Sequence, residues 1–194
     1  MKMIVAAAAL AVAATFLPGQ WLELRPDASA LRFLTCHFTH WTFEQLAWDA
    51  IAFTALGIAC ARRNPRATQA TLLAGMLLIP VAVLALAPEV GAYRGLSGLA
   101  SAMFALLLRF ERRRLTWPVV TLAILFAAKL AFEGVTGGTL FANDLGDDVV
   151  SVPVAHLAGA LVGAIASFAA SGSPVLPNRI DLHERARSLE YEQR

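Results

Sequence analysis

The chain has 194 residues, of which 58% are hydrophobic and 15% are charged. An average soluble domain has about 25% charged residues, so this composition excludes an ordinary soluble protein and indicates a membrane protein. The formal net charge of +2 comes from short basic clusters between apolar runs, a pattern that does not indicate nucleic-acid binding.

The apolar runs predict an all-α membrane protein with six transmembrane helices. A span needs about 20 apolar residues. The candidate spans are residues 3–17, 43–61, 68–87, 95–110, 117–134 and 152–171. The N-terminal run resembles a signal peptide, but it lacks a clear small-x-small cleavage site, so we favour an uncleaved first helix over a cleaved signal. The fourth span is short, which predicts that it begins in a recess below the membrane surface.

Basic residues orient these spans. The clusters ARRNPR (61–66) and RFERRR (109–114) follow the second and fourth spans, and more arginines lie in the tail. The positive-inside rule places all three segments, and both termini, in the cytoplasm. Residues 1–172 then form one membrane domain, and residues 173–194 form a polar cytoplasmic tail. The outer loops are 18–42, 88–94 and 135–151, and Cys36 and Cys60 fall toward opposite faces, which argues against a disulfide.

Two polar residues share a depth near the outer face. Ser97 lies between Gly95 and Gly98 at the outer end of the fourth span, and His156 lies one turn into the sixth span. A histidine in an apolar helix usually faces a bundle interior or a water-filled cavity. It could be a purely structural residue that is hydrogen-bonded across helices, or it could be the base that activates the serine.

Glycines favour the second interpretation. Gly159 and Gly163 follow His156 in the pattern H-x-x-G-x-x-x-G and lie on much the same helical face. Such small residues let helices approach closely, so His156 could reach Ser97 if this face packs against the fourth span. Gly95 and Gly98 permit a tight turn and close approach of a substrate backbone. The first-turn amides of that helix could donate to an oxyanion.

The segment LRFLTCHFTHWTFEQLAWDAIAFTALG (31–57) completes the pattern. Together with Gly-x-Ser-Gly and H-x-x-G-x-x-x-G it resembles the rhomboid intramembrane serine proteases, over spans two to six. The likeness is greatest to the rhombosortases, a compact bacterial branch inferred to act on proteins with C-terminal Gly-Gly sorting tails. It implies a six-helix rhomboid-like bundle in the bacterial inner membrane, with the active site toward the periplasm.

The resemblance assigns roles to individual residues. Ser97 matches the nucleophile and His156 the general base of the family's catalytic pair. His40 matches the loop histidine before the second span. Arg32 matches the arginine of a Trp-Arg pair, although Leu31 stands where tryptophan is expected.

Two positions depart from the family pattern. Gln45 stands where the family has its oxyanion histidine, and Asp49 stands where it has an asparagine. Glutamine can still donate through its amide, whereas aspartate could donate only when protonated. Asp49 could instead orient His156 or another polar group, so its role stays open.

Other polar residues have simpler interpretations. His37 and His40 lack the company of a zinc motif, so we expect neither a metal nor a cofactor. Lys129 and Glu133 lie one turn apart and could pair within the fifth span. The tryptophans Trp41, Trp48 and Trp117 are typical interfacial or packing residues.

The sequence therefore predicts a serine endopeptidase that cleaves single-span or tail-anchored membrane proteins near the outer face of the bilayer. The departures at Gln45 and Asp49 leave open a non-catalytic rhomboid-like protein that binds transmembrane helices. A small-solute transporter is disfavoured because the polar residues gather near one face instead of at mid-membrane.

Overall fold

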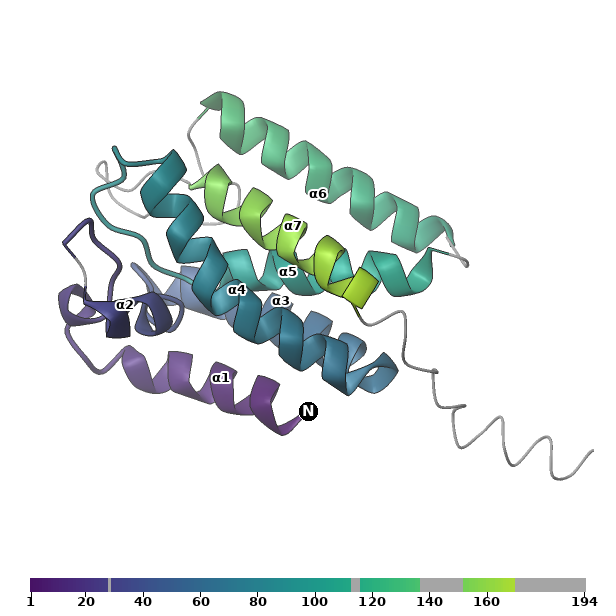
Figure 1. Ribbon diagram of the computed structural model, residues 1–194, viewed down its shortest axis with the longest axis horizontal. Coiled ribbons are helices and arrows are strands. Elements are labelled where there is room, and N and C mark those ends of the chain that lie inside the picture. The colour runs from purple at the N-terminus through teal and green to yellow at the C-terminus, as the bar shows by residue number, and fades with distance from the viewer. Residues whose placement is uncertain (28, 113–115, 137–151, 170–194) are drawn as a thin grey trace, which may run out of the picture.

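The computed structural model describes residues 1–27, 29–112, 116–136 and 152–169, and these residues form helices and connecting segments without a strand. Figure 1 shows the arrangement. The elements are α1 (Lys2–Ala14), the 3-10 turn η1 (Gly19–Trp21), α2 (Ala30–Thr35), α3 (Phe43–Arg63), α4 (Pro65–Leu86), α5 (Ser97–Glu111), α6 (Trp117–Thr136) and α7 (Pro153–Ala169). The all-helical prediction is therefore confirmed for the described residues.

Each of the six expected spans contains one helix, with small shifts at the ends. The first helix ends at Ala14 instead of Leu17, because the chain turns ahead of Pro18, a residue that disfavours helix in its predecessor. The short helix α2 inside the loop 18–42 was not predicted. The aspartates of the loop 135–151 and the tail 173–194 lie outside the described residues.

Two helices, α4 and α6, are long and apolar enough to cross a membrane, and α1 and α7 are shorter apolar helices. Large apolar side chains on α6 are exposed, among them Leu122, Ile124 and Leu125. An apolar surface of this kind suits lipid contact. Composition, helix length and surface together indicate a membrane protein.

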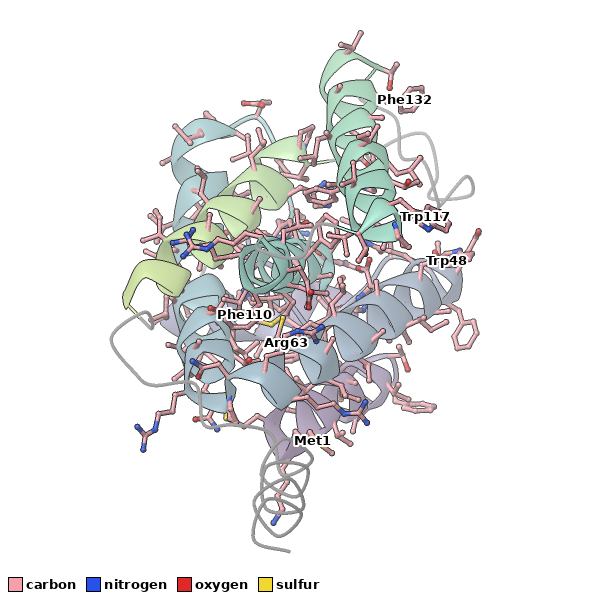
Figure 2. The ribbon with its side chains drawn as sticks, turned by 90° about the vertical axis from the view of Figure 1, so that its right-hand side faces the viewer. Met1, Trp48, Arg63, Phe110, Trp117 and Phe132 are labelled. Atoms are coloured by element: carbon pink, nitrogen blue, oxygen red, sulfur yellow. The ribbon has the colours of Figure 1, made fainter. Side chains whose placement is uncertain are left out.

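Helix α5 is the centre of the bundle. Figure 2 shows it end-on, surrounded by the other long helices. Its side chains Leu99, Met103 and Leu106 are fully buried, and it contacts α3, α4 and α7 extensively. Helix α1 packs on the outer side of α3, where the absence of a side chain on Gly57 makes room for Ile4. Ser97 is the first residue of α5, so its position is set by a helix that is packed against three others.

Side-chain caps fix the beginnings of the neighbouring helices. The Oγ1 atom of Thr42 accepts the N–H of Gln45 at 3.1 Å at the start of α3. The Oδ1 atom of Asn64 accepts the N–H of Ala67 at 3.0 Å at the start of α4, where Pro65 occupies the first helical position. Both are common N-terminal signals. Asn64 is also the C-cap of α3, so this one residue connects α3 to α4.

The loop 18–42 is attached to the segment that leads into α5. Leu24 and Tyr93 form an isolated antiparallel bridge with two backbone hydrogen bonds of 3.1 and 2.9 Å. The buried carboxylate of Glu23 accepts a hydrogen bond from Arg94 Nε at 2.7 Å and also pairs with Arg25. Burial raises the pKa of Glu23, but the bonds from the two arginines outweigh it and lower that pKa. The loop is therefore fixed beside the residues that precede Ser97.

His37 anchors the same loop to α4. Its side chain is fully buried, its Nε2 atom donates to the carbonyl of Met76 at 3.2 Å, and its ring packs edge-on against Tyr93. Burial lowers the pKa of His37 to about 4, although the bond to the Met76 carbonyl opposes this shift. The imidazole is therefore neutral in the folded protein at neutral pH.

This environment predicts a loss of stability in acid. The folded protein has a His37 pKa of about 4 against an ordinary value of 6.5, so between these values the unfolded chain binds a proton that the folded chain does not. The free energy of unfolding should fall as the pH is lowered from about 6.5 to about 4, by about 3 kcal/mol from this group alone. Above pH 6.5 the neutral His37 makes its full contribution to the free energy of unfolding.

The measurement is the thermal midpoint of the purified protein in detergent at pH 7.5 and 4.5. The variant His37→Gln keeps a donor for the Met76 carbonyl but does not titrate, so acidification should lower its midpoint less. Equal losses in the two proteins would show that His37 is not the responsible group.

Candidate active site

The backbones of α5 and α7 are in direct contact. A Cβ atom added to Gly159 would lie 2.0 Å from the carbonyl oxygen of Gly98, and one added to Gly163 would lie 2.0 Å from the carbonyl oxygen of Ala102. No side chain fits at such a distance, so this approach requires glycine. The predicted packing of the glycine face of the sixth span against the fourth span is what the helices show.

The pairing also fixes the direction of the two helices. Gly98 lies opposite Gly159, and Ala102, one turn later, lies opposite Gly163, one turn later. The helices are therefore parallel, and their N-terminal ends lie together. Ser97 and His156 consequently come from the same end of the bundle, Ser97 half-buried and His156 7% exposed.

His156 belongs to a chain of polar groups that crosses from α7 to α6. Its Nδ1 atom lies 2.9 Å from Oε2 of Glu133, and Oε1 of Glu133 lies 2.5 Å from Nζ of Lys129. Glu133 is 2% exposed. The predicted pairing of Lys129 with Glu133 is confirmed, but the bond from Glu133 to His156 was not predicted.

The bond to Glu133 leaves Nε2 as the ring nitrogen that could serve Ser97. Among the residues that the structure describes, no hydrogen bond joins Ser97 to His156. Catalytic hydrogen bonds are often long in a protein without substrate and tighten when substrate binds. The parallel helices supply the shared depth, and the pairing of the two residues in catalysis stays a prediction.

A glycine with unusual backbone geometry leads into α5. Gly95 has φ of +121°, a conformation that other residues rarely adopt, and its N–H donates to the carbonyl of Cys36 at 3.0 Å. Leu96 then caps the helix without a side-chain hydrogen bond. The first N–H groups of α5 have no intrahelical carbonyl to bond, so they can donate hydrogen bonds to an oxygen atom of a bound molecule.

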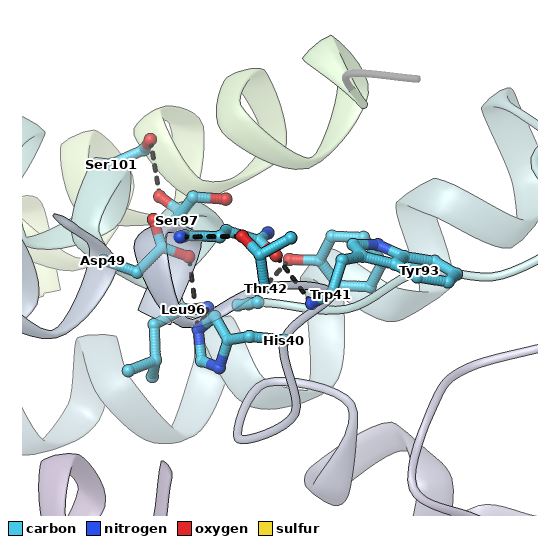
Figure 3. Close-up of polar contacts among 10 residues, drawn as sticks. His40, Trp41, Thr42, Asp49, Tyr93, Leu96, Ser97 and Ser101 are labelled. Carbon is cyan, nitrogen blue, oxygen red and sulfur yellow. Dashed lines mark hydrogen bonds and ion pairs between the residues drawn. The ribbon is translucent and has the colours of Figure 1, made fainter. Parts of the chain in front are cut away.

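The other candidate residues gather around this turn. The N–H of Leu96 donates to Nε2 of His40 at 3.3 Å, and Oδ2 of Asp49 lies 3.3 Å from the same nitrogen. Figure 3 shows His40, Asp49 and Leu96 in this arrangement. Asp49 therefore contacts His40, whereas the acid that contacts His156 is Glu133. The alternative in which Asp49 orients another polar group fits this contact.

Gln45 faces the same glycine. Its Oε1 atom accepts the N–H of Trp41 at 2.9 Å, which turns its amide nitrogen toward the α5 turn. A Cβ atom at Gly95 would lie 3.0 Å from Nε2 of Gln45 and 3.0 Å from Oδ2 of Asp49. The structure thus brings Gln45, Asp49 and His40 together two residues before Ser97.

The match of Arg32 to the arginine of a Trp-Arg pair stays a prediction. Arg32 lies on α2, and its carbonyl accepts the N–H of Cys36. The arginine that stacks on a tryptophan in the described structure is Arg94, whose guanidinium carbon lies 3.9 Å from the ring centroid of Trp41. No group of three or more His, Cys, Asp or Glu side chains in the described ranges is arranged to hold a metal ion.

Comparison with protein families gives one clear match. The family model described as Rhomboid domain matches residues 27–173, which is well over half of the chain and includes every candidate site residue. No curated protein matches the chain significantly.

The contact between α5 and α7 predicts a clear difference among glycine variants. Gly159→Ala and Gly163→Ala should each lower the stability by about 1–3 kcal/mol, because the added methyl group meets a backbone carbonyl and forces the helices apart. Gly134→Ala on α6 is the matched control, since a Cβ atom there has nothing within 4 Å.

The measurement is the thermal midpoint of each variant in detergent. Gly134→Ala should leave the midpoint unchanged or raise it slightly, because alanine favours helix. A Gly159→Ala protein as stable as the Gly134→Ala protein would contradict the close approach of the two helices.

Proposed function

Because the chain belongs to the rhomboid family, we propose that it is an intramembrane serine endopeptidase with Ser97 as nucleophile and His156 as general base. Rhomboid proteins are serine proteases that act on membrane proteins within the bilayer. The observation that carries the proposal is the parallel contact of α5 and α7, which puts these two residues at one end of the bundle.

The proposed reaction follows from the groups present. Nε2 of His156 accepts the proton of Ser97 as Oγ attacks the carbonyl carbon of the substrate. The peptide C–N bond then breaks, and His156 returns the proton to the leaving amine, which gives an acyl-enzyme and a free amine. Water, deprotonated by His156, then attacks the ester carbonyl. The bond from this carbon to Oγ of Ser97 breaks, His156 returns the proton to Oγ, and the carboxyl product leaves.

Donors for the developing oxyanion come from the α5 turn. The N–H of Ser97 lies in the first helical turn, and the amide nitrogen of Gln45 points to Gly95. Both are neutral donors that can stabilise negative charge in a low-dielectric site. In this proposal Gln45 takes the part that histidine plays in the family pattern, and the contact of Asp49 with His40 supports the turn.

Charge supports the proposed orientation. The basic residues Arg62, Arg63 and Arg66 lie at the junction of α3 and α4, and Arg109 lies near the end of α5, each at the end of its helix away from Ser97. An ion pair between Arg63 and Glu111 joins these ends, and Figure 2 shows Arg63 beside Phe110 near the end of α5. We place this end in the cytoplasm, the six long helices across the bacterial inner membrane, and Ser97 toward the periplasm.

The proposed substrate is a single-span or tail-anchored protein with glycines near the outer end of its membrane helix. A transmembrane helix hides its peptide bonds in internal hydrogen bonds, so it must unwind before Ser97 can reach one. A Gly-Gly pair favours unwinding and lacks side chains that would clash in the recess. Cleavage there would release the outer domain from its anchor.

A non-catalytic protein that binds transmembrane helices is the second candidate. The observation that favours it concerns the two departures from the family pattern. Gln45 already accepts the N–H of Trp41, and Oδ2 of Asp49 is buried against His40 without a hydrogen-bond partner among the described residues. Such a protein would hold the substrate helix without cutting it.

Loss of the Ser97 hydroxyl separates the two candidates. Ser97→Ala should lower cleavage of a co-expressed Gly-Gly-tailed substrate by about 1,000-fold or more, because no nucleophile remains. Ser101→Ala, one turn along the same helix, should still cleave. Products are followed by size on immunoblots, and undiminished cleavage by Ser97→Ala would exclude this serine as the nucleophile.

Substitution in the substrate tests the proposed specificity. Replacing both glycines of the tail with leucine should block processing by the unmodified protein, because leucine stabilises the substrate helix and fills the space that glycine leaves. Mass spectrometry of the released C-terminus identifies the cleaved bond. Cleavage at the same bond and rate in the leucine substrate would favour a rhomboid protease with a different preference.

A further inference from the structure

Helix α6 turns a single carboxylate inward. Within α6, all of which the structure describes, Glu133 is the buried residue, and large apolar neighbours such as Phe132 and Val135 are exposed. Each of its two oxygens has a different partner, Lys129 for Oε1 and His156 for Oε2. A buried carboxylate in a membrane helix is costly without such partners and commonly marks a functional site.

We propose that Glu133 is a positioning residue that holds His156 in the tautomer required of a general base, so that Ser97, His156 and Glu133 act as a triad anchored by Lys129. This inference rests on the proposed protease function. It assigns to α6 a part in catalysis that the two-residue pair leaves out.

The tautomer follows from hydrogen-bond chemistry. An ionised carboxylate can only accept, so the Nδ1 atom that lies 2.9 Å from Glu133 carries the ring proton. The lone pair then resides on Nε2, which is the atom that must take the proton from Ser97. When His156 becomes an imidazolium during the reaction, the carboxylate stabilises its charge.

Lys129 fixes which oxygen is used. Its ammonium group only donates, and it bonds Oε1 from one turn away on the same helix. Oε2 is therefore left for His156. A second contact of α6 with the bundle is made by the rings of Phe126 and Phe104, whose centroids are 4.9 Å apart. The bond from Glu133 to His156 also attaches α6 to α7. Variants of similar stability separate a role in catalysis from this attachment.

In the variant Glu133→Gln, Lys129 and His156 both require the single oxygen of the amide. This competition lowers activity only if Glu133 sets the tautomer of His156. The amide has one oxygen, and the donor Lys129 claims it, which turns the NH₂ group toward Nδ1 of His156. The imidazole must then accept at Nδ1 and carry its proton on Nε2, where it cannot act as base. Glu133→Gln should therefore lower kcat by roughly 10,000-fold, as is typical when a triad carboxylate becomes an amide, with little change in KM.

Removal of Lys129 should relieve the conflict. In the double variant Lys129→Met, Glu133→Gln, the amide oxygen can turn to Nδ1, so kcat should recover at least about tenfold over Glu133→Gln alone. Its matched control is Lys129→Met, Glu133→Leu, which also removes both charges but offers His156 no acceptor. The glutamine version should be clearly more active than the leucine version at a similar thermal midpoint.

These two neutral variants keep the test decisive even if Glu133→Gln fails to fold with an unpaired Lys129. Equal kcat in the glutamine and leucine versions would overturn the proposal and reduce Glu133 to an attachment point. Thr121→Val, an exposed change on the same helix, should match the unmodified protein.

Ser97→Ala in the same assay separates this inference from the proposed function. Cleavage that persists in Ser97→Ala overturns the protease assignment itself. An inactive Ser97→Ala protein together with a fully active Glu133→Gln protein overturns only the role of Glu133.

Discussion

The carbonyl groups of Gly98 and Ala102 rest on the bare backbone of α7 at Gly159 and Gly163, and the rest of the site depends on this contact. Two helices in lipid gain little from hydrophobic burial, so close packing of small residues must hold them together. The contact is parallel and close, which sets the depth of His156 relative to Ser97. It also brings His156 beside α6, where Glu133 accepts a hydrogen bond from the Nδ1–H of its ring.

Around this contact the fold divides into a rigid interior and an apolar exterior. Leu99, Met103 and Leu106 of α5 are fully enclosed, whereas the large side chains of α6 face outward. The polar residues of the proposed reaction therefore lie where α5 begins, between the loop 18–42 and the N-terminal ends of α3 and α7. Gly95 is the junction, because its positive φ turns the chain from the bridge with Leu24 into the helix of Ser97.

Much of this arrangement could be read from the sequence, since apolar runs and paired glycines are local signals. The helices and the packing of α7 against α5 followed from them. The family resemblance singled out His40, Gln45 and Asp49, and these three residues gather around Gly95 and Leu96. The bond from Glu133 to His156 joins residues 23 positions apart, and the pair of Glu23 with Arg94 joins residues 71 positions apart. Contacts between residues this far apart leave no periodic pattern in a single sequence, so neither pair could be predicted. The short helix α2 was missed because six residues carry no amphipathic pattern.

The bridge between Leu24 and Tyr93 joins the loop 18–42 to the segment before Ser97, so that the two segments are expected to move together. Two backbone hydrogen bonds contribute about 2 kcal/mol, and the buried pair of Glu23 with Arg94 adds to them. The loop therefore cannot swing away as an independent lid. Moving the loop requires breaking these bonds or shifting the turn at Gly95, two residues before Ser97. In the proposed protease, a substrate must therefore fit the space beside this turn with the loop in place, which favours a slender, flexible segment over a bulky one.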